Sequence, residues 1–134
     1  MYYLDCMNVR YIANDQDITG LPIEIYLPDN HVAIEFWDKS QETDYAYSRE
    51  RCKNIACRQA GVKMIRIMPR NARIYENCLC ILQPDESIRN LEQAISVAFK
   101  VIGIYDRRIN INLSRDMEKI RNIAFERMLL KEYQ

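Results

Sequence analysis

The chain has 134 residues, of which 49% are hydrophobic and 28% charged, and its 19 basic and 19 acidic side chains give a formal net charge of zero. A chain of this length forms one ordinary globular domain and buries roughly two-thirds of its unfolded surface, so it needs no disulfide or structural metal to fold. Its apolar runs are far shorter than the ~20 residues of a membrane span, and its N-terminus lacks the pattern of a signal peptide, so we expect a cytoplasmic protein with no membrane partner.

A β-hairpin is the first element that the sequence predicts clearly. Residues 21–28 and 31–37 each alternate between apolar and polar side chains, which is the period of a strand. Pro28, Asp29, Asn30 and His31 lie between the two runs and favour a turn. Residues 9–12 ahead of the hairpin indicate only a marginal extended segment.

A basic amphipathic helix is predicted over residues 44–60, with Gly61 as its stop signal. Its expected core-facing side chains lie at roughly helical spacing; they are Tyr47, Ile55 and either Cys52 or Ala56. Two short runs follow, at residues 62–68 and 73–82. Both are rich in β-forming residues and are expected to be interior strands.

Two further helices are predicted in the second half of the chain. One starts after the cluster at residues 85–87 and presents a single apolar stripe up to Gly103. The other starts at Ser114 as its N-cap, after a short strand or extended link. The predicted fold is therefore an α/β single domain with a mixed central sheet flanked by helices, with a core at about residues 10–103 and a C-terminal helical extension over residues 114–134.

The cysteines and the single histidine bear on metal and redox chemistry. No C-x-x-C pair occurs among the five cysteines, and His31 is the only histidine, which argues against zinc and against a disulfide framework. Cys78 and Cys80 lie two residues apart, on one face of a predicted strand. Packing as small hydrophobic side chains is favoured there over a redox or metal role.

The zero net charge conceals a segregation of charge along the chain. Residues 1–43 contain two basic and eight acidic side chains, whereas residues 44–73 contain eight basic and two acidic ones. Acidic side chains beside basic ones suit a metal-dependent enzyme that acts on a polyanion, because carboxylates bind the metal and cations bind phosphates. A fold that neutralises its own charges is the alternative.

Two glutamates are predicted to face each other across the hairpin. With Asp29 and Asn30 as a two-residue loop, the numbers of cross-strand partners sum to 59, which pairs Glu24 with Glu35. Two like charges opposite each other cost stability. Either a shared divalent cation offsets this repulsion, or the carboxylates are hydrated or paired with arginines on an exposed face. In this register Trp37 lies on the same strand face as Glu35.

At these residues the sequence resembles a known family. The run IEIYLPDNHVAIEFWDK, followed by KNIACRQAGVKMIRIMP, is similar to the core of the PD-(D/E)xK restriction-endonuclease-like superfamily, in particular to small phage and mobile-element nucleases related to very short patch repair endonucleases. The match covers roughly residues 10–70, and the SRD tripeptide at 114–116 is also similar. The resemblance implies a restriction-endonuclease-like core that binds Mg²⁺ or Mn²⁺ and cleaves DNA.

The resemblance also assigns roles to individual residues. It gives Glu24 the place of the acidic residue on the first hairpin strand and Glu35 that of the carboxylate in the E-x-K motif, so these two would bind the metal. The lysine of that motif is missing, because Trp37 stands at its position. Lys39 and Lys53 are the two candidates to replace it, since a lysine that neutralises phosphate charge can approach from a neighbouring turn or helix.

The basic helix supplies the predicted contacts to DNA. Its cations can bind phosphates and its tyrosines can stack on bases, although charged helix faces are more often simply solvated. Trp37 is a further candidate for base stacking, with packing as the alternative. The nucleic-acid-binding candidates are Arg49, Arg51, Lys53, Arg58 and Trp37, with Tyr45 and Tyr47 for stacking.

Three functions follow from these patterns. The first is a metal-dependent DNA endonuclease, which the paired glutamates favour. The second, which Trp37 favours, is a nuclease-fold protein without catalysis that binds nucleic acid or protein, such as a phage regulator or an inhibitor of a host defence complex. The third is an interaction domain whose C-terminal helix, with the sequence RNIAFERMLLKEY, docks on a protein partner or on a second copy in a homodimer.

Overall fold

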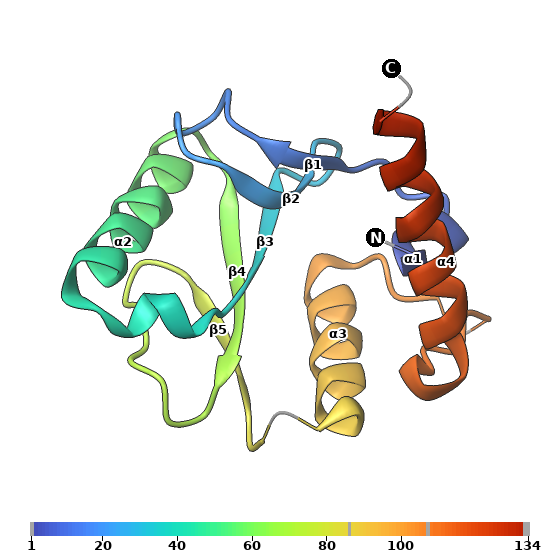
Figure 1. The fold of residues 1–134 in the computed structure, drawn as a ribbon. Helices are drawn as coiled ribbons and strands as arrows, with labels where there is room; N and C mark the ends of the chain where they lie inside the picture. The colour runs from blue at the N-terminus through green and yellow to red at the C-terminus, as the bar shows by residue number, and fades with distance from the viewer. Residues whose placement is uncertain (1, 86, 107, 133–134) are drawn as a thin grey trace.

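The computed structural model describes residues 2–85, 87–106 and 108–132, with side chains described up to residue 123. Its centre is a mixed five-stranded sheet in the order β1-β2-β3-β4-β5, flanked by helices on both faces (Figure 1). The strands are β1 (Ile12–Asp15), β2 (Ile23–Leu27), β3 (Val32–Phe36), β4 (Lys63–Pro69) and β5 (Leu79–Gln83). The helices are α1 (Tyr2–Cys6), η1 (Lys39–Glu42), α2 (Asp44–Gln59), α3 (Ile88–Ile102) and α4 (Leu113–Glu132). The α/β single domain with a mixed sheet is thus confirmed.

The hairpin register matches the sequence prediction. Ile25 pairs with Ile34 and Leu27 with Val32, so partner numbers sum to 59. β1 joins the hairpin in antiparallel orientation, whereas β3, β4 and β5 run parallel to one another. Because α2 is the crossover from β3 to β4, it must return the chain to the same end of the sheet.

Several elements differ from the predictions. The sequence analysis missed α1 and η1, and β5 begins at Leu79 although the predicted run began at residue 73. No strand forms at residues 109–113. Ser114 is not the N-cap of α4, because the side-chain oxygen of Asn112 accepts the hydrogen bond from the backbone N–H of Arg115. Short helices and caps of this kind depend on local hydrogen bonds rather than on hydrophobic period.

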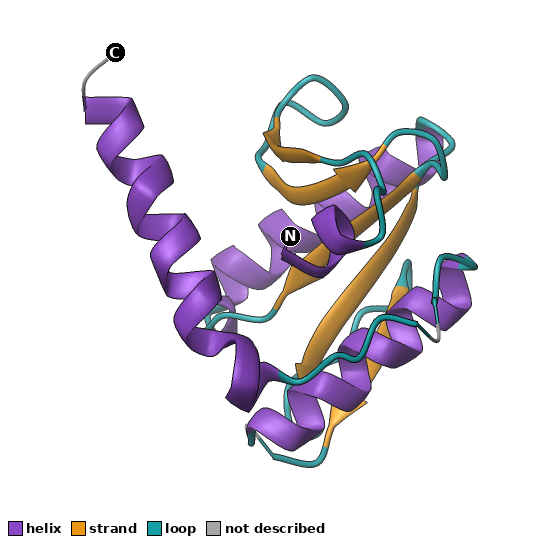
Figure 2. Ribbon diagram, turned by 90° about the vertical axis from the view of Figure 1, so that its right-hand side faces the viewer, coloured by secondary structure: helices purple, strands orange, loops and turns teal. Residues whose placement is uncertain are grey.

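The apolar core lies in two clusters, one on each face of the sheet. The larger cluster packs α1 and α3 against the strands and includes Leu4, Ile65 and Phe99. The smaller cluster lies under α2 and includes Ile23, Cys57 and Met64. Figure 2 shows α3 running across one face of the sheet, with α2 behind it. The α2 face therefore has fewer apolar contacts, which leaves room there for polar side chains.

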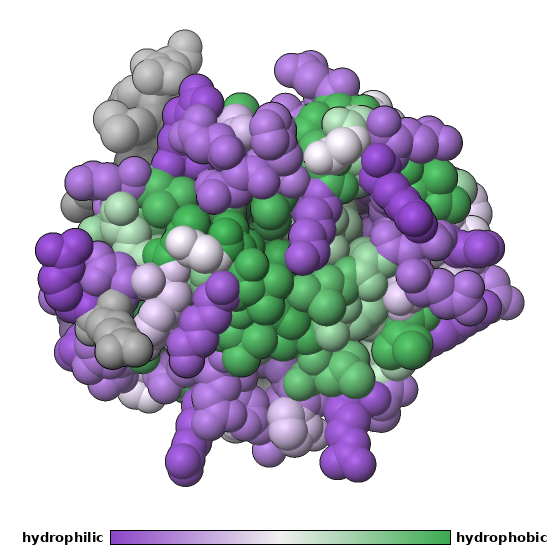
Figure 3. All heavy atoms as spheres, turned by 180° about the vertical axis from the view of Figure 1, so that it is seen from behind, coloured by the Kyte–Doolittle hydropathy of each residue, from purple (hydrophilic) through white to green (hydrophobic). Residues whose placement is uncertain are grey.

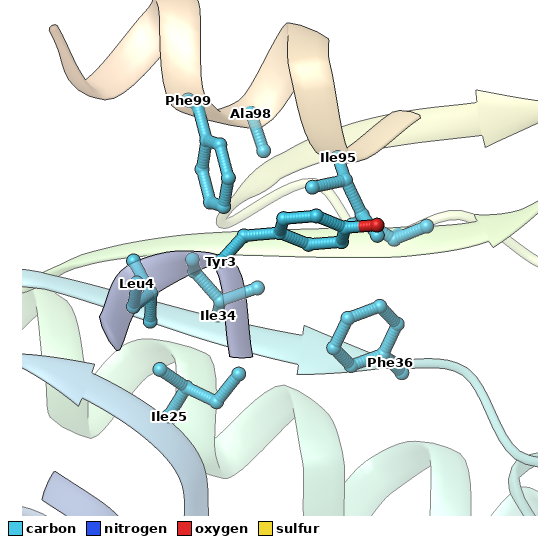
Figure 4. Close-up of a pocket in the computed structure, with 9 residues that line it drawn as sticks. Tyr3, Leu4, Ile25, Ile34, Phe36, Ile95, Ala98 and Phe99 are labelled. Atoms are coloured by element: carbon cyan, nitrogen blue, oxygen red, sulfur yellow. The ribbon is translucent and has the colours of Figure 1, made fainter. Parts of the chain in front are cut away.

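Tyr3 ties both ends of the chain to this core. Its ring lies between Ile95 and Ala98 of α3 and Ile34 and Phe36 of β3, beside a small apolar cavity of about 50 Å³ (Figure 4). Its hydroxyl donates a hydrogen bond of 2.9 Å to Asp116 in α4 and accepts one of 3.1 Å from the N–H of Asn112. Asp116 is buried, and the hydrogen bond from the side chain of Arg115 is the main cause that lowers its pKa to about 2.

Replacing Tyr3 with phenylalanine is expected to lower the melting temperature by roughly 3 to 8 °C, because the buried carboxylate of Asp116 loses a hydrogen bond while the apolar packing stays. Thermal denaturation followed by circular dichroism measures the change. Tyr105→Phe, at a half-exposed ring, is the matched control and should melt like the wild type. Equal melting temperatures for all three proteins would show that the Tyr3 hydroxyl does not hold α4 to the core.

Apolar side chains also gather on the surface over the free edge of the sheet. Seen from behind, a continuous apolar area occupies the middle of the molecule (Figure 3). Leu79 and Leu82 of β5 and Val97 and Val101 of α3 are among the exposed large hydrophobic side chains of the described residues. None of the helices in the described part of the chain is both long and apolar enough to cross a membrane. The predicted docking stripe of the C-terminal helix lies mostly outside the residues whose side chains are described.

Candidate functional site

Glu24 and Glu35 lie where β2 separates from β3. The backbone N–H of Glu24 donates to Oε1 of Glu35 at 3.1 Å, and the N–H of Phe36 donates to Oε1 of Glu24 at 3.2 Å. Each carboxylate therefore accepts a hydrogen bond from a backbone N–H of the opposite strand. These two bonds stand where the next backbone–backbone hydrogen bonds between β2 and β3 would form. Glu35 is buried, with 3% of its surface exposed, whereas Glu24 is exposed as a residue although its carboxyl group is partly buried. The two glutamates lie next to each other, although the ladder between β2 and β3 ends at Ile25 and Ile34.

Near neutral pH the carboxyl group of Glu24 is partly protonated, so the pair carries less than two negative charges. Burial of its carboxyl group, followed by the charge of Glu35, raises the pKa of Glu24 to about 7. A hydrogen bond between the two carboxyl groups acts in the same direction, whereas the Phe36 N–H and Lys53 oppose it. A close carboxylate pair that binds a proton near pH 7 has excess negative charge for a cation to neutralise.

Lys53 reaches the same carboxylates from α2. Its Nζ lies 3.2 Å from Oε1 of Glu35 and 3.2 Å from Oε2 of Glu50, and its side chain is 7% exposed. Thr43 caps α2 by accepting a hydrogen bond from the N–H of Ala46, which fixes where the helix begins. The helix thus positions a buried lysine against the carboxylate of Glu35.

The inner face of α2 is polar, which the sequence analysis did not predict. Its buried residues are Lys53, Asn54 and Cys57, whereas Cys52 and Ile55 are exposed. The predicted core face of this helix was therefore wrong. Glu50, Lys53, Asn54 and Cys57 follow the helical i, i+3, i+4, i+7 spacing, so they form one stripe directed at the sheet.

Arg66 of β4 holds this stripe in place. Its guanidinium is 2% exposed and donates to Oδ1 of Asn54 at 2.7 Å and to Oε2 of Glu50 at 2.8 Å. It also lies 4.7 Å from the ring centre of Tyr75. Hydrogen bonds and ion pairs therefore join Arg66, Glu50, Lys53 and Glu35 in an unbroken series. Sequence reasoning placed Arg66 in a strand but assigned no function to it or to Glu50.

A polar pocket of about 320 Å³, called the acidic pocket below, is lined by residues that include Glu35, Glu50 and Lys53. It lies between the β2 and β3 ends, η1 and the first half of α2. Its charged lining residues are Glu24, Glu35, Asp38, Arg49, Glu50 and Lys53, and Tyr45 borders it with 80% of its surface exposed. Of the two candidate lysines, only Lys53 lines this pocket.

The other predicted site residues lie elsewhere. Trp37 and Lys39 line a neighbouring groove together with Arg70 and Arg73, so Trp37 does not lie in the acidic pocket although the strand period predicted the same face as Glu35. Arg51 is exposed and is not among the residues of the acidic pocket. Arg58 borders a separate cleft at the end of α2, nine residues or about 14 Å along the helix from Arg49. Tyr47 is stacked between Tyr75 and Arg73.

A divalent metal fits the donor set of the acidic pocket. Glu24 and Glu35 supply hard carboxylate oxygens, and the proton that Glu24 binds near pH 7 is one that a cation would displace. Among residues 2–85, 87–106 and 108–132, no group of three or more histidine, cysteine, aspartate or glutamate side chains is arranged to hold a metal. A cation here would have two protein carboxylates and keep several waters, which is usual for Mg²⁺.

Comparisons of the chain with family models, with curated proteins and with solved structures found no match.

Replacing Glu24 with glutamine is expected to stabilise the protein by about 1 kcal/mol at pH 8 and to change little at pH 5, a modest effect because solvent screens this exposed residue. The pKa of Glu24 is raised in the folded state, so the wild type loses stability as the pH rises from about 4.5 to 7, the range in which the unfolded chain has lost this proton and the folded protein still holds it. Urea denaturation at both pH values measures the difference. The same stabilisation at pH 5 and pH 8 would contradict the raised pKa.

Proposed function

We propose that the chain is a metal-dependent deoxyribonuclease of the PD-(D/E)xK type, in which Lys53 replaces the lysine that Trp37 displaces from the motif. The observation that supports this proposal is the contact of 3.2 Å between Nζ of Lys53 and Oε1 of Glu35, beside Glu24 in one pocket. A lysine on α2 thereby occupies the chemical environment of the motif lysine, although it comes from another element.

Each residue has a separate task in this reaction. Glu24 and Glu35 would hold Mg²⁺ or Mn²⁺, which when bound polarises the scissile phosphate and activates a water. Lys53 stabilises the negative charge that develops on the phosphate. Glu50 and Arg66 keep Lys53 in position, because Glu50 forms an ion pair with Lys53 and another with Arg66. Arg49 and Tyr45 lie at the mouth of the pocket, where a phosphate and a base of the DNA would enter.

The direct test is cleavage of supercoiled plasmid and of single-stranded DNA in the presence of Mn²⁺ or Mg²⁺. We expect nicking by the wild type and none by the Glu24→Gln/Glu35→Gln variant, which keeps the size of both side chains. Metal-dependent nicking that persists in this variant would indicate a contaminating nuclease or another site. Absence of cleavage of both substrates by the wild type would contradict the proposed nuclease activity.

Arg49 and Arg51 offer a matched pair for testing DNA binding. Both are exposed arginines of α2, but only Arg49 lines the acidic pocket. Arg49→Ala is expected to weaken DNA binding by about 1 kcal/mol and to lower the dependence of binding on salt by about one phosphate contact, whereas Arg51→Ala should leave both nearly unchanged. Fluorescence anisotropy at several salt concentrations measures this. An equal loss of DNA affinity in the two variants would show that DNA does not bind at the acidic pocket.

A nuclease-fold protein that binds without cleaving is the second candidate. Trp37 stands in place of the motif lysine, and Lys53 is already paired with two carboxylates, so its charge is partly neutralised. This candidate predicts binding to nucleic acid or to a protein with no metal-dependent cleavage. Docking of the C-terminal helix on a partner or on a second copy also stays a prediction, which the sedimentation behaviour of the purified protein tests.

A further inference from the structure

Two thiols meet at the start of β5, on the other side of Arg66 from the acidic pocket. Cys78 immediately precedes β5 and Cys80 is its second residue, and their sulfur atoms lie 3.8 Å apart. Neither side chain is fully buried. Cys78 also borders an open cleft with Arg58, Gly61 and Asn77, and Cys80 is partly exposed.

The surroundings of the two thiols make them unequal. The amide of Asn54 donates to the sulfur of Cys78 at 3.6 Å, and the Cys80 thiol group lies 3.6 Å from the carbonyl oxygen of Tyr75. The hydrogen bond from Cys78 is the main cause that lowers the pKa of Cys80 to about 6, and the same bond raises the pKa of Cys78 far above its usual range. This lowered pKa favours Cys80 over Cys78 as the nucleophilic thiolate near neutral pH.

A dithiol of this kind can bind a soft metal or form a disulfide. Within the described ranges no third histidine, cysteine or carboxylate joins the pair in a metal-binding group. A disulfide needs no third ligand, and the sulfur atoms must approach from 3.8 Å to about 2.05 Å to form it. The arrangement therefore favours a disulfide.

We propose that Cys78 and Cys80 are a peroxide-reactive pair that forms a reversible intramolecular disulfide. The Cys80 thiolate attacks one oxygen of hydrogen peroxide, the O–O bond breaks, and hydroxide leaves and takes a proton from solvent. The sulfur of Cys78 then attacks the sulfur of the resulting Cys80 sulfenic acid, the S–O bond breaks, and the hydroxide leaves as water with the Cys78 thiol proton. Two thiols are oxidised and one peroxide is reduced to two waters.

The disulfide changes the environment of Asn54. Its amide loses the thiol of Cys78 as a partner, and its side-chain oxygen is the acceptor for Arg66 Nε at 2.7 Å. Arg66 in turn binds Glu50 of the acidic pocket. Asn54 is thus the first residue outside the pair that the disulfide affects. Formation of the disulfide does not depend on the proposed function of the acidic pocket.

Mass spectrometry of the full chain tests the proposal. The reduced protein is treated with hydrogen peroxide, alkylated and digested with trypsin, which releases residues 74–89 as one peptide that contains both cysteines. We expect this peptide to be unalkylated and lighter by two hydrogen atoms, and to be alkylated twice after treatment with dithiothreitol. Its oxidation should be roughly tenfold faster than that of the exposed Cys6 and Cys52, because the thiolate is the reactive form.

Single variants separate the two roles. Cys78→Ser should stop at the sulfenic acid of Cys80, which dimedone traps, whereas Cys80→Ser should leave Cys78 reduced at the same dose. The side-chain amide signal of Asn54 in the NMR spectrum of the wild type should shift on oxidation. The proposal is overturned if residues 74–89 stay alkylated at both cysteines while Cys6 and Cys52 are oxidised, or if dimedone does not label Cys80 in Cys78→Ser.

Discussion

Lys53→Met is expected to lower the rate of DNA cleavage by about 10²- to 10³-fold, since removal of one preorganised charge-stabilising group costs roughly that much in other enzymes. The change removes the cation from both of its carboxylate partners, Glu35 and Glu50. Methionine keeps most of the length of the lysine, so the space in the pocket stays filled. Single-turnover cleavage of plasmid DNA in Mn²⁺ measures the rate.

Two companion variants make the Lys53 result interpretable. Lys39→Met removes the other candidate lysine, which is exposed on η1 and does not line the acidic pocket, so cleavage should stay at the wild-type rate. Lys53→Met/Glu35→Gln removes the buried carboxylate charge along with its partner and should recover stability without recovering cleavage. If Lys39→Met abolished cleavage and Lys53→Met did not, the assignment of the lysine would be wrong.

Arg66→Met is expected to destabilise the fold by about 3 to 5 kcal/mol, a large part of the roughly 5 to 15 kcal/mol typical of a domain. Arg66 is 2% exposed, and its loss leaves the side-chain oxygen of Asn54 and one side of Glu50 without their partner. The contact with the ring of Tyr75 is lost as well. Urea denaturation followed by tryptophan fluorescence and circular dichroism measures the free energy of unfolding.

Arg10→Met is the matched control for Arg66→Met. Arg10 makes an ion pair of 2.7 Å with Asp29, as short as those of Arg66, but both side chains are 66% exposed. Solvent screens such a pair, so its loss should cost less than about 1 kcal/mol. Equal costs for the two arginine variants would show that the burial of the Arg66 network adds nothing to stability.

The sequence predicts best where one physical rule acts alone. The turn residues Asp29 and Asn30 and the alternation around them set the hairpin register, and that register places Glu24 beside Glu35. The apolar stripe and Gly103 likewise locate α3, since Gly103 ends it in the left-handed conformation with φ of 88°. In both cases local spacing is sufficient, and no distant contact is needed.

The inner face of α2 could not be predicted in this way. The search for a core face looked for apolar side chains, whereas the side chains that this helix buries include Lys53 and Asn54. A charged stripe on a helix usually faces solvent, and only the buried partners Glu35 and Arg66 reverse that preference here. Those partners are set by the parallel pairing of β3 with β4, which depends on residues far apart in the chain.

Trp37 shows the same limit at the end of a strand. The period of two predicts its side chain on the face of Glu35, but β3 ends at Phe36, so the period no longer applies at the next residue. The chain then enters η1, and Trp37 lines the groove with Lys39, Arg70 and Arg73. Trp37 therefore does not line the acidic pocket, and the lysine that contacts Glu35 comes from α2.

Calorimetric titration of Mn²⁺ at pH 8, where Glu24 has given up its proton, tests the central claim most directly. The wild type is expected to bind one ion, with an affinity that falls as the pH is lowered through 7, and Glu24→Gln/Glu35→Gln is expected to bind none. Absence of binding by the wild type, or equal binding by the variant, would contradict the claim that Glu24 and Glu35 hold a catalytic metal.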